Sequence, residues 1–140
     1  MVPRKFIAGL FLVILTISLS NSSFAKDLYA FDLRKQRPDL FKIYRAILPK
    51  SLTGLDWFAK LEGVSGPLKI GSVGGADFLS GSSCQPHNCN MSYVNFMIST
   101  DGKRAIAMFV DDTKINGAIL FAGNPTNSEK INLLDQQSFR

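Results

Sequence analysis

The order of patterned segments predicts an α+β fold, an antiparallel β-sheet of about five strands flanked by N-terminal and C-terminal helices. Residues 38–48 and 55–61 carry apolar side chains at helical spacing. From residue 68 onward, short apolar segments alternate with turn signals such as Gly74-Gly75 and Asn116-Gly117, which is the pattern of strands joined by hairpins. Helices followed by such strands are typical of α+β domains, in which the helices cover an antiparallel sheet.

The individual elements follow from these patterns. The first main helix begins at Pro38-Asp39 and is stopped by Pro49, and the second ends before Gly63. A short helix is also expected within residues 27–37. Strands are expected over residues 68–73, 76–80, 93–98, 105–110 and 118–121, and a short last strand or helix over residues 131–134. The aromatic side chains expected in the core are Phe41, Trp57, Phe58, Phe96, Phe109 and Phe121.

The N-terminus has the pattern of a secretory signal peptide. A short positive region precedes an apolar run over residues 6–19, and Ser23-Phe24-Ala25 follows as a small-x-small cleavage site. An uncleaved anchor is less favoured, because the run is shorter than the roughly 20 residues that a membrane-spanning helix needs. We expect residues 1–25 to be cleaved and residues 26–140 to form one exported domain that is not attached to a membrane.

The net charge gives no indication of a nucleic-acid partner. The full chain carries +5, and loss of Arg4 and Lys5 with the leader lowers the charge to +3. The densest basic patch, Arg34-Lys35-Gln36-Arg37, is interpreted as the solvated start of a helix rather than a nucleic-acid footprint.

The most informative segment lies between the two cysteines of the chain, Cys84 and Cys89, which enclose its single histidine, His87. An even number of cysteines in an exported protein favours a disulfide, and two cysteines allow one pairing. The bridge would force the residues between into a tight turn, in which Pro86 fixes one φ angle and Asn88 tolerates turn geometry. Such a loop is held in one shape, which lowers the ordering cost of binding.

The side chain that this loop would present is an imidazole. His87 is flanked by Gln85, Pro86 and Asn88, which are all neutral. An imidazole donates one hydrogen bond when neutral and two when protonated, so a carboxylate or a carboxylate pair is its natural complement. The cleft of a glycosidase has two carboxyl groups beside the scissile bond, and a rigid loop with histidine at its tip would fit between them and displace the substrate.

Metal binding is a weaker interpretation of the same loop. Cys84, His87 and Cys89 are metal-ligand types, but a closed tetrahedral zinc site needs a fourth ligand, which Asp77 or Asp101 would have to supply. An exported setting favours a disulfide over thiolates. A lone histidine is also often a plain surface or core residue. We expect no metal and no cofactor.

Catalysis is the least favoured interpretation. Any histidine-dependent mechanism would have to use His87, the thiols are expected to be bonded, and the chain has no Gly-x-Ser-x-Gly motif. Asp111-Asp112 is interpreted as a solvated charge pair in a turn rather than a general acid/base pair. We therefore expect a protein that is not an enzyme.

The loop also resembles a known family. Cys84-Gln85-Pro86-His87-Asn88-Cys89 is similar to the Cys-Lys-Pro-His-Asp-Cys loop of the bacterial inhibitors of vertebrate lysozyme, the Ivy family. The resemblance runs from about Pro38 onward and includes Leu48-Pro49, Trp57, Gly63-Val64, Pro67 and Asp101-Gly102.

This resemblance implies a periplasmic inhibitor of C-type lysozyme, with residues 26–140 as a single lysozyme-inhibitor domain. It implies that the loop enters the enzyme's cleft, where His87 hydrogen-bonds to the two catalytic carboxyl groups. Cys84 and Cys89 would form the disulfide that stiffens the loop, and Pro86 would set its tip.

Two loop positions depart from the family's pattern, since Gln85 replaces its lysine and Asn88 its aspartate. Both changes remove a charge and keep a hydrogen-bonding side chain. Asn88 can partly replace the aspartate if the role of that residue is to orient the loop, whereas inhibition would be weaker if its charge matters.

The cell's own lytic transglycosylases are an alternative target for the same loop, because they also present an acidic residue in a cleft. Some members of the family are homodimers, so the resemblance allows a homodimer as well as a monomer.

Overall fold

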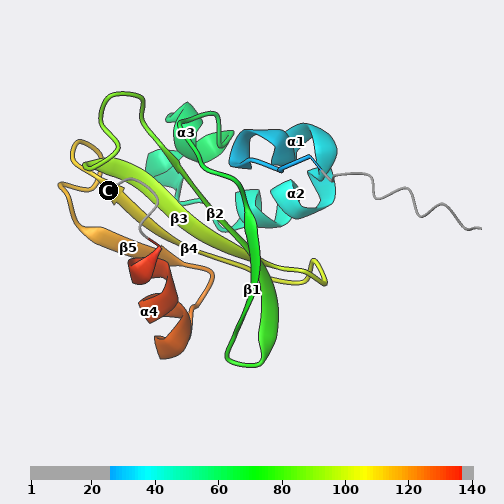
Figure 1. The fold of residues 1–140 in the computed structure, drawn as a ribbon. Helices are drawn as coiled ribbons and strands as arrows, with labels where there is room; N and C mark the ends of the chain where they lie inside the picture. Colours follow the sequence, from blue (N-terminus) through cyan, green and yellow to red (C-terminus); the bar gives the residue numbers. More distant parts are fainter. Residues whose placement is uncertain (1–25, 137–140) are drawn as a thin grey trace, which may run out of the picture.

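The computed structural model describes residues 26–136 and confirms the predicted α+β class (Figure 1). The strands form one antiparallel sheet in sequential order, β1-β2-β3-β4-β5. The predicted leader, residues 1–25, lies outside the described residues. Within residues 26–136, no helix is long and apolar enough to cross a membrane. The strand bounds are β1 Lys69–Val73, β2 Ala76–Cys84, β3 Ser92–Ser99, β4 Ala105–Asp111 and β5 Ile119–Ala122.

Helices precede and follow the sheet. The first helix predicted from periodicity ends earlier than expected, at Ala46, because Leu48 precedes Pro49 and a residue before proline is pushed out of the helical region. The second is only one turn long, since Leu61 adopts a φ of 56°. The helices are α1 Leu33–Gln36, α2 Pro38–Ala46, α3 Asp56–Ala59 and α4 Asn127–Asp135, with 3-10 turns at Ala30–Asp32 and Lys50–Leu52.

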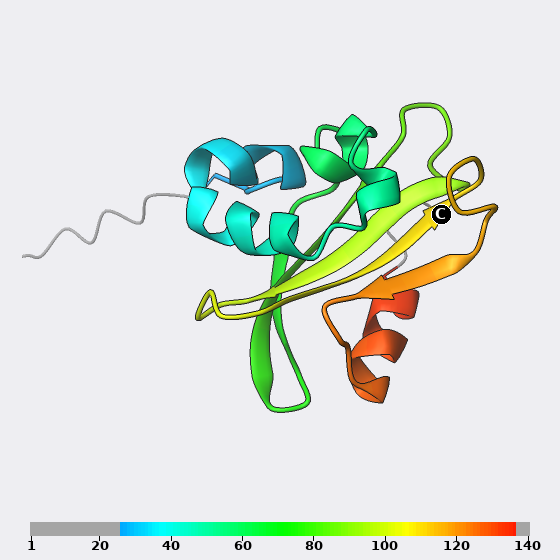
Figure 2. The same cartoon turned by 180° about the vertical axis from the view of Figure 1, so that it is seen from behind.

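The sheet lies between two helical layers. Helices α1 to α3 cover one face and α4 lies against the other (Figures 1 and 2). Phe58, Phe96 and Phe109 are fully buried on the first face, as predicted for the core. Phe41 and Trp57 pack partly buried against the same cluster, and Phe121 packs against the smaller one. That smaller cluster contains Phe78, Met97, Ile106, Met108 and Leu133.

The last element is a helix, and it begins earlier than residue 131. Thr126 accepts a hydrogen bond from the backbone N–H of Glu129 and donates its own backbone N–H to the Glu129 carboxylate, so the two residues form a capping box. Arg104 from the turn before β4 donates two hydrogen bonds of 2.6 Å to the same carboxylate. This pairing fixes α4 against the sheet.

The cysteine segment lies at one end of the sheet, between β2 and β3. Gly74 and Gly75 both have positive φ angles, 59° and 81°, as a tight turn of type I′ between β1 and β2 requires. Strand β2 continues past the predicted Ser80 to Cys84, which pairs with Tyr93 of β3. The connection between β2 and β3 therefore projects beyond the end of the sheet (Figures 1 and 2).

Candidate functional site

A disulfide closes the connection between β2 and β3. Cys84 and Cys89 are bonded, and their Cα atoms are 4.9 Å apart, within the usual range of disulfides. The pairing expected from the cysteine count is therefore present. Cys84 is fully buried at the end of β2, whereas Cys89 is partly buried, so the bridge ties the outer part of the loop to the core of the domain.

A tight turn with His87 at its tip lies between the cysteines. The backbone N–H of Asn88 donates to the carbonyl oxygen of Gln85 over 3.0 Å, which closes a four-residue turn. Pro86 occupies its second position and His87 its third, where His87 adopts a φ of 65°. Proline followed by a positive φ is the signature of a type II turn. Pro86 and His87 are both exposed, so the turn presents the imidazole to solvent.

The two side chains at the base of the turn bind each other. The Nδ2 group of Asn88 donates to Oε1 of Gln85 over 3.0 Å. These are the two positions where the loop differs from the pattern Cys-Lys-Pro-His-Asp-Cys, and the structure brings them into contact. Both groups are neutral, so the base of the turn is spanned by a hydrogen bond that carries no net charge.

The incoming side of the loop rests on the segment after α3. Cys84 and Val64 form an isolated β-bridge, with N–H to carbonyl distances of 3.0 and 3.1 Å. This bridge requires close packing of the backbone at Gly63. A Cβ atom on Gly63 would lie 2.6 Å from Oγ of Ser83 and 2.8 Å from Cβ of Trp57. Only glycine fits here without displacing the strand that leads into the loop.

The outgoing side of the loop is held by Ser92, the first residue of β3. Its backbone N–H donates to the carbonyl oxygen of Asn88, and its carbonyl oxygen accepts from the N–H of Gln85, both over 3.0 Å. Ser92 is fully buried. One residue therefore bonds to both ends of the turn that carries His87.

The side chain of Ser92 joins a buried network that the sequence did not indicate. Its Oγ accepts from Nε1 of Trp57 over 2.9 Å and donates to Oδ2 of Asp111 over 2.5 Å. Asp111 is only 1% exposed, so the interpretation of Asp111-Asp112 as a solvated pair is wrong for Asp111. Burial raises the pKa of this carboxyl, but hydrogen bonds from Ser92, Lys114 and Thr113 outweigh burial and lower the pKa below its usual value.

The residues considered for metal binding do not come together. Both sulfurs of the loop are in the disulfide. Asp77 lies near the start of β2 and Asp101 in the turn after β3, at the opposite end of these strands from the loop. Across residues 26–136, no group of three His, Cys, Asp or Glu side chains is placed to hold a metal ion.

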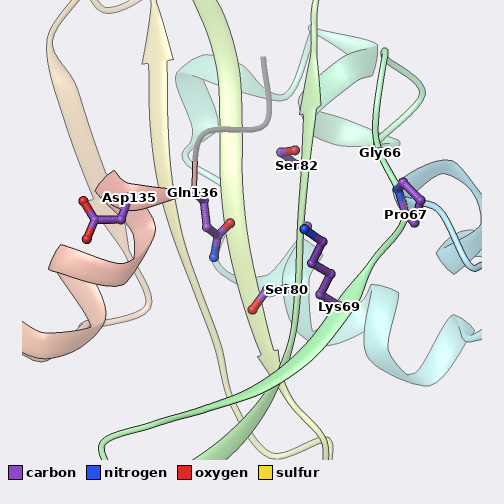
Figure 3. A pocket seen from close by; sticks show the side chains of 8 residues that line it. Gly66, Pro67, Lys69, Ser80, Ser82, Asp135 and Gln136 are labelled. Carbon is purple, nitrogen blue, oxygen red and sulfur yellow. The ribbon is translucent and has the colours of Figure 1, made fainter. Parts of the chain in front are cut away.

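A separate hollow lies on the α4 side of the sheet (Figure 3). Its volume is about 370 Å³, and none of the six loop residues lines it. Ser80 and Ser82 point into it from β2, and Gln136 reaches it from the end of α4. The remaining lining residues are Gly66, Pro67, Lys69, Gly81 and Asp135. The exposed imidazole and this polar pocket are thus on different parts of the molecule.

Comparison with known families identifies the family of the chain. A family model described as inhibitor of vertebrate lysozyme (Ivy) matches residues 45–118, more than half of the chain. This chain belongs to the Ivy family. Comparison with curated proteins gives no match. The Ivy match begins at the end of α2 and includes the Cys84–Cys89 loop, the bridge at Val64 and the Ser92–Asp111 pair, whereas β5 and α4 lie beyond it. Membership in an inhibitor family agrees with the expectation that the protein is not an enzyme.

Proposed function

We propose that this Ivy-family protein inhibits a C-type lysozyme by placing the Cys84–Cys89 loop in the active-site cleft, where His87 hydrogen-bonds to the catalytic carboxyl groups. The observation that carries the proposal is the exposed imidazole at the tip of a turn fixed at both ends. A disulfide, an amide pair and two backbone hydrogen bonds with Ser92 hold that turn. Because the loop is ordered before binding, little conformational entropy is lost on insertion.

The chemistry of the tip suits a cleft with two acidic groups. The two carboxyl groups of a retaining glycosidase are about 5–5.5 Å apart, and a histidine side chain between them can donate from one or both ring nitrogens. His87 is the only ionisable side chain of the loop segment Gln85–Asn88. The tip would therefore bring its donors to the carboxyl groups without a second charge that would have to be desolvated in the cleft.

Apolar side chains flank the loop and extend the proposed contact surface. Val64, which bridges to Cys84, is 48% exposed, and Met91, which follows the loop, is 44% exposed. Interfaces commonly combine a central polar anchor with surrounding apolar contacts that exclude water. We propose that Val64 and Met91 contact the rim of the cleft while His87 occupies its floor.

The proposed setting is the periplasm. Residues 1–25 have the charge and apolar pattern of a cleaved leader, and a disulfide persists in an oxidising compartment. Cleavage would leave residues 26–140 as one inhibitor domain with a charge of +3. Because this charge is positive, binding to a basic lysozyme would depend on the fit of the loop and not on long-range attraction.

The proposal is tested by inhibition of a purified C-type lysozyme with the oxidised protein, residues 26–140, and with His87→Ala. Inhibition by the wild type that falls by orders of magnitude in the variant supports the proposal. An inhibition constant that is unchanged by the substitution removes His87 from the mechanism. Absence of inhibition by the wild type rules out the C-type lysozyme as target.

A second target is favoured by the neutral base of the turn. One ring nitrogen of His87 can donate a hydrogen bond to a single acidic residue, and the neutral Gln85–Asn88 pair adds no second charge to be desolvated in the cleft. Lytic transglycosylases place one such residue in their cleft. The wild type and His87→Ala are therefore also assayed against a purified lytic transglycosylase. Stronger inhibition of the transglycosylase than of the C-type lysozyme would identify the transglycosylase as the main target.

A further inference from the structure

We infer that Asp111 is a positioning residue for the His87 turn, acting through Ser92 from the neighbouring strand. Ser92 of β3 and Asp111 of β4 are directly paired in the sheet. The role in inhibition rests on the proposed function, but the role in holding the loop can be tested without it.

The two oxygens of the Asp111 carboxylate have separate tasks. Oδ1 accepts hydrogen bonds from the backbone N–H groups of Thr113 and Lys114, over 3.0 and 2.6 Å, and from Oγ1 of Thr113 over 3.0 Å. These bonds fix the turn between β4 and β5. Oδ2 accepts from Oγ of Ser92 over 2.5 Å. Oδ1 thus stabilises the turn between β4 and β5, and Oδ2 binds Ser92 at the base of the His87 loop.

The orientation of the Ser92 hydroxyl is determined by its two neighbours. The indole N–H of Trp57 can only donate, so Ser92 Oγ must accept from it. An ionised carboxylate can only accept, so the single hydroxyl proton must point to Asp111. The hydroxyl therefore has one arrangement that satisfies all three groups, and this arrangement fixes the rotamer of a residue whose backbone bonds to Gln85 and Asn88.

The burial of Asp111 is costly in the absence of a cation. The side chain is 1% exposed, and within the described part of the chain its carboxylate forms no salt bridge. A buried carboxylate must be compensated by hydrogen bonds, and a turn alone could be capped by a neutral asparagine. The additional bond that a carboxylate provides is the one to Ser92. Charge-assisted bonds are shorter and stronger than neutral ones, which suits a group that must hold a strained turn in place.

Asp111→Asn separates the two tasks. The asparagine oxygen can still accept from Thr113 and Lys114. Its Nδ2 group can only donate, so the Ser92 proton loses its acceptor and the charge-assisted bond to the loop is lost. Thr113→Ala is the matched control, because it removes one bond to Oδ1 and leaves Oδ2 with Ser92. We expect Asp111→Asn to weaken inhibition about tenfold, corresponding to the loss of one charge-assisted bond, and Thr113→Ala to change it little.

Two natural probes report on the loop independently of any lysozyme. The chain has one tryptophan, Trp57, and one histidine, His87. In Asp111→Asn we expect altered Trp57 fluorescence emission, shifted NMR signals of the His87 ring and faster amide exchange at Ser92 and Asn88. Ser92→Ala should reproduce these changes. Leu133→Ala removes a side chain from the buried cluster between α4 and the sheet, so it should lower stability without changing these signals.

The outcomes separate this inference from the proposed function. Unchanged Trp57 and His87 signals in both Asp111→Asn and Ser92→Ala would overturn the positioning role, whatever the inhibition constants. Altered signals together with a wild type that inhibits no lysozyme would retain the positioning role and reject the proposed function. If Asp111→Asn fails to fold, Ser92→Ala decides through the His87 ring signals and the amide exchange at Asn88, because it removes the bond to Trp57 directly.

Discussion

The side-chain amide of Asn88 donates a 3.0 Å hydrogen bond to the side-chain oxygen of Gln85, across the base of the turn that carries His87. In the family's loop pattern the same two positions hold oppositely charged residues, Asp and Lys. In this chain a neutral pair spans the turn. The turn should therefore keep its shape when ions screen charges.

The contribution of this pair can be measured with a double-mutant cycle. Gln85→Ala, Asn88→Ala and the double variant should show a coupling of about 0.5–1.5 kcal/mol in the free energy of lysozyme binding, the range of a neutral hydrogen bond. The coupling should be the same at low and high ionic strength. Strictly additive effects, or a coupling that disappears in salt, would contradict the pairing.

His87 should lower the stability of the fold through its positive φ angle, while its imidazole strengthens binding to the enzyme. Its φ of 65° lies in a region where a side chain costs about 1–2 kcal/mol and glycine costs nothing. His87→Gly should therefore match or exceed the thermal stability of the wild type while losing inhibition. His87→Asn, which tolerates this φ but has no imidazole, should behave similarly. A marked fall in the melting temperature of both variants would show that the imidazole is needed for the fold.

The close packing at Gly63 predicts that an alanine there lowers stability, and Gly66, three residues away, provides the control. Gly63→Ala would place a Cβ atom against Ser83 Oγ, Trp57 Cβ and the carbonyl of Cys84, so the bridge between Val64 and Cys84 must open. Gly66→Ala meets no atom within 4 Å. We expect the first variant to lose about 1–3 kcal/mol of unfolding free energy and the second to lose much less, by chemical denaturation. Equal losses would contradict the close packing at Gly63.

Reduction of the disulfide should affect binding more than folding. The bond between Cys84 and Cys89 closes a short loop, for which the chain-entropy model gives about 2 kcal/mol of stabilisation. Cys84→Ser/Cys89→Ser should remain folded, as followed by circular dichroism, and inhibit more weakly because the turn is ordered only on binding. Inhibition that is equal with and without reductant would show that preorganisation by the disulfide is unimportant.

The lowered pKa of Asp111 predicts an acid-dependent term in stability. A carboxyl whose folded pKa lies below its usual value of 3.8 stabilises the fold above that value, and this stability is lost as pH falls through the folded pKa. The difference in unfolding free energy between the wild type and Asp111→Asn should therefore be greatest near neutral pH and shrink below about pH 4. A difference that is independent of pH in this range would contradict an ionised, hydrogen-bonded Asp111.

The sheet and the loop could be predicted because their signals are local. Gly74-Gly75 indicates a hairpin within a few residues of the strands that it joins. The disulfide followed from two cysteines and one possible pairing. Where a strand lacks alternating apolar residues, the sequence pattern predicts an end that comes before the end of the strand in the structure. Residues 81–84 of β2 were missed because their strand character depends on pairing with β3, and Gly81 leaves room there for the ring of Phe96.

The support of the loop could not be predicted, because it depends on contacts between distant residues. Asp111 resembles a solvated turn residue in sequence, and its burial follows from its pairing with Ser92, 19 residues away. Trp57 was expected in the core, and its bond to Ser92 spans 35 residues. The start of α4 is a different case, since the spacing of Thr126 and Glu129 is a capping-box signal that was present in the sequence.

We propose that the His87 loop occupies the active-site cleft of a C-type lysozyme. The most direct test is calorimetric titration of that enzyme with the oxidised protein, with and without a saturating chito-oligosaccharide in the cleft. We predict competition, with an apparent Kd that rises by a factor of one plus the ratio of the sugar concentration to the sugar's own Kd. Tight binding with a Kd that the oligosaccharide does not change would place the complex elsewhere on the enzyme and contradict insertion of the loop into the cleft.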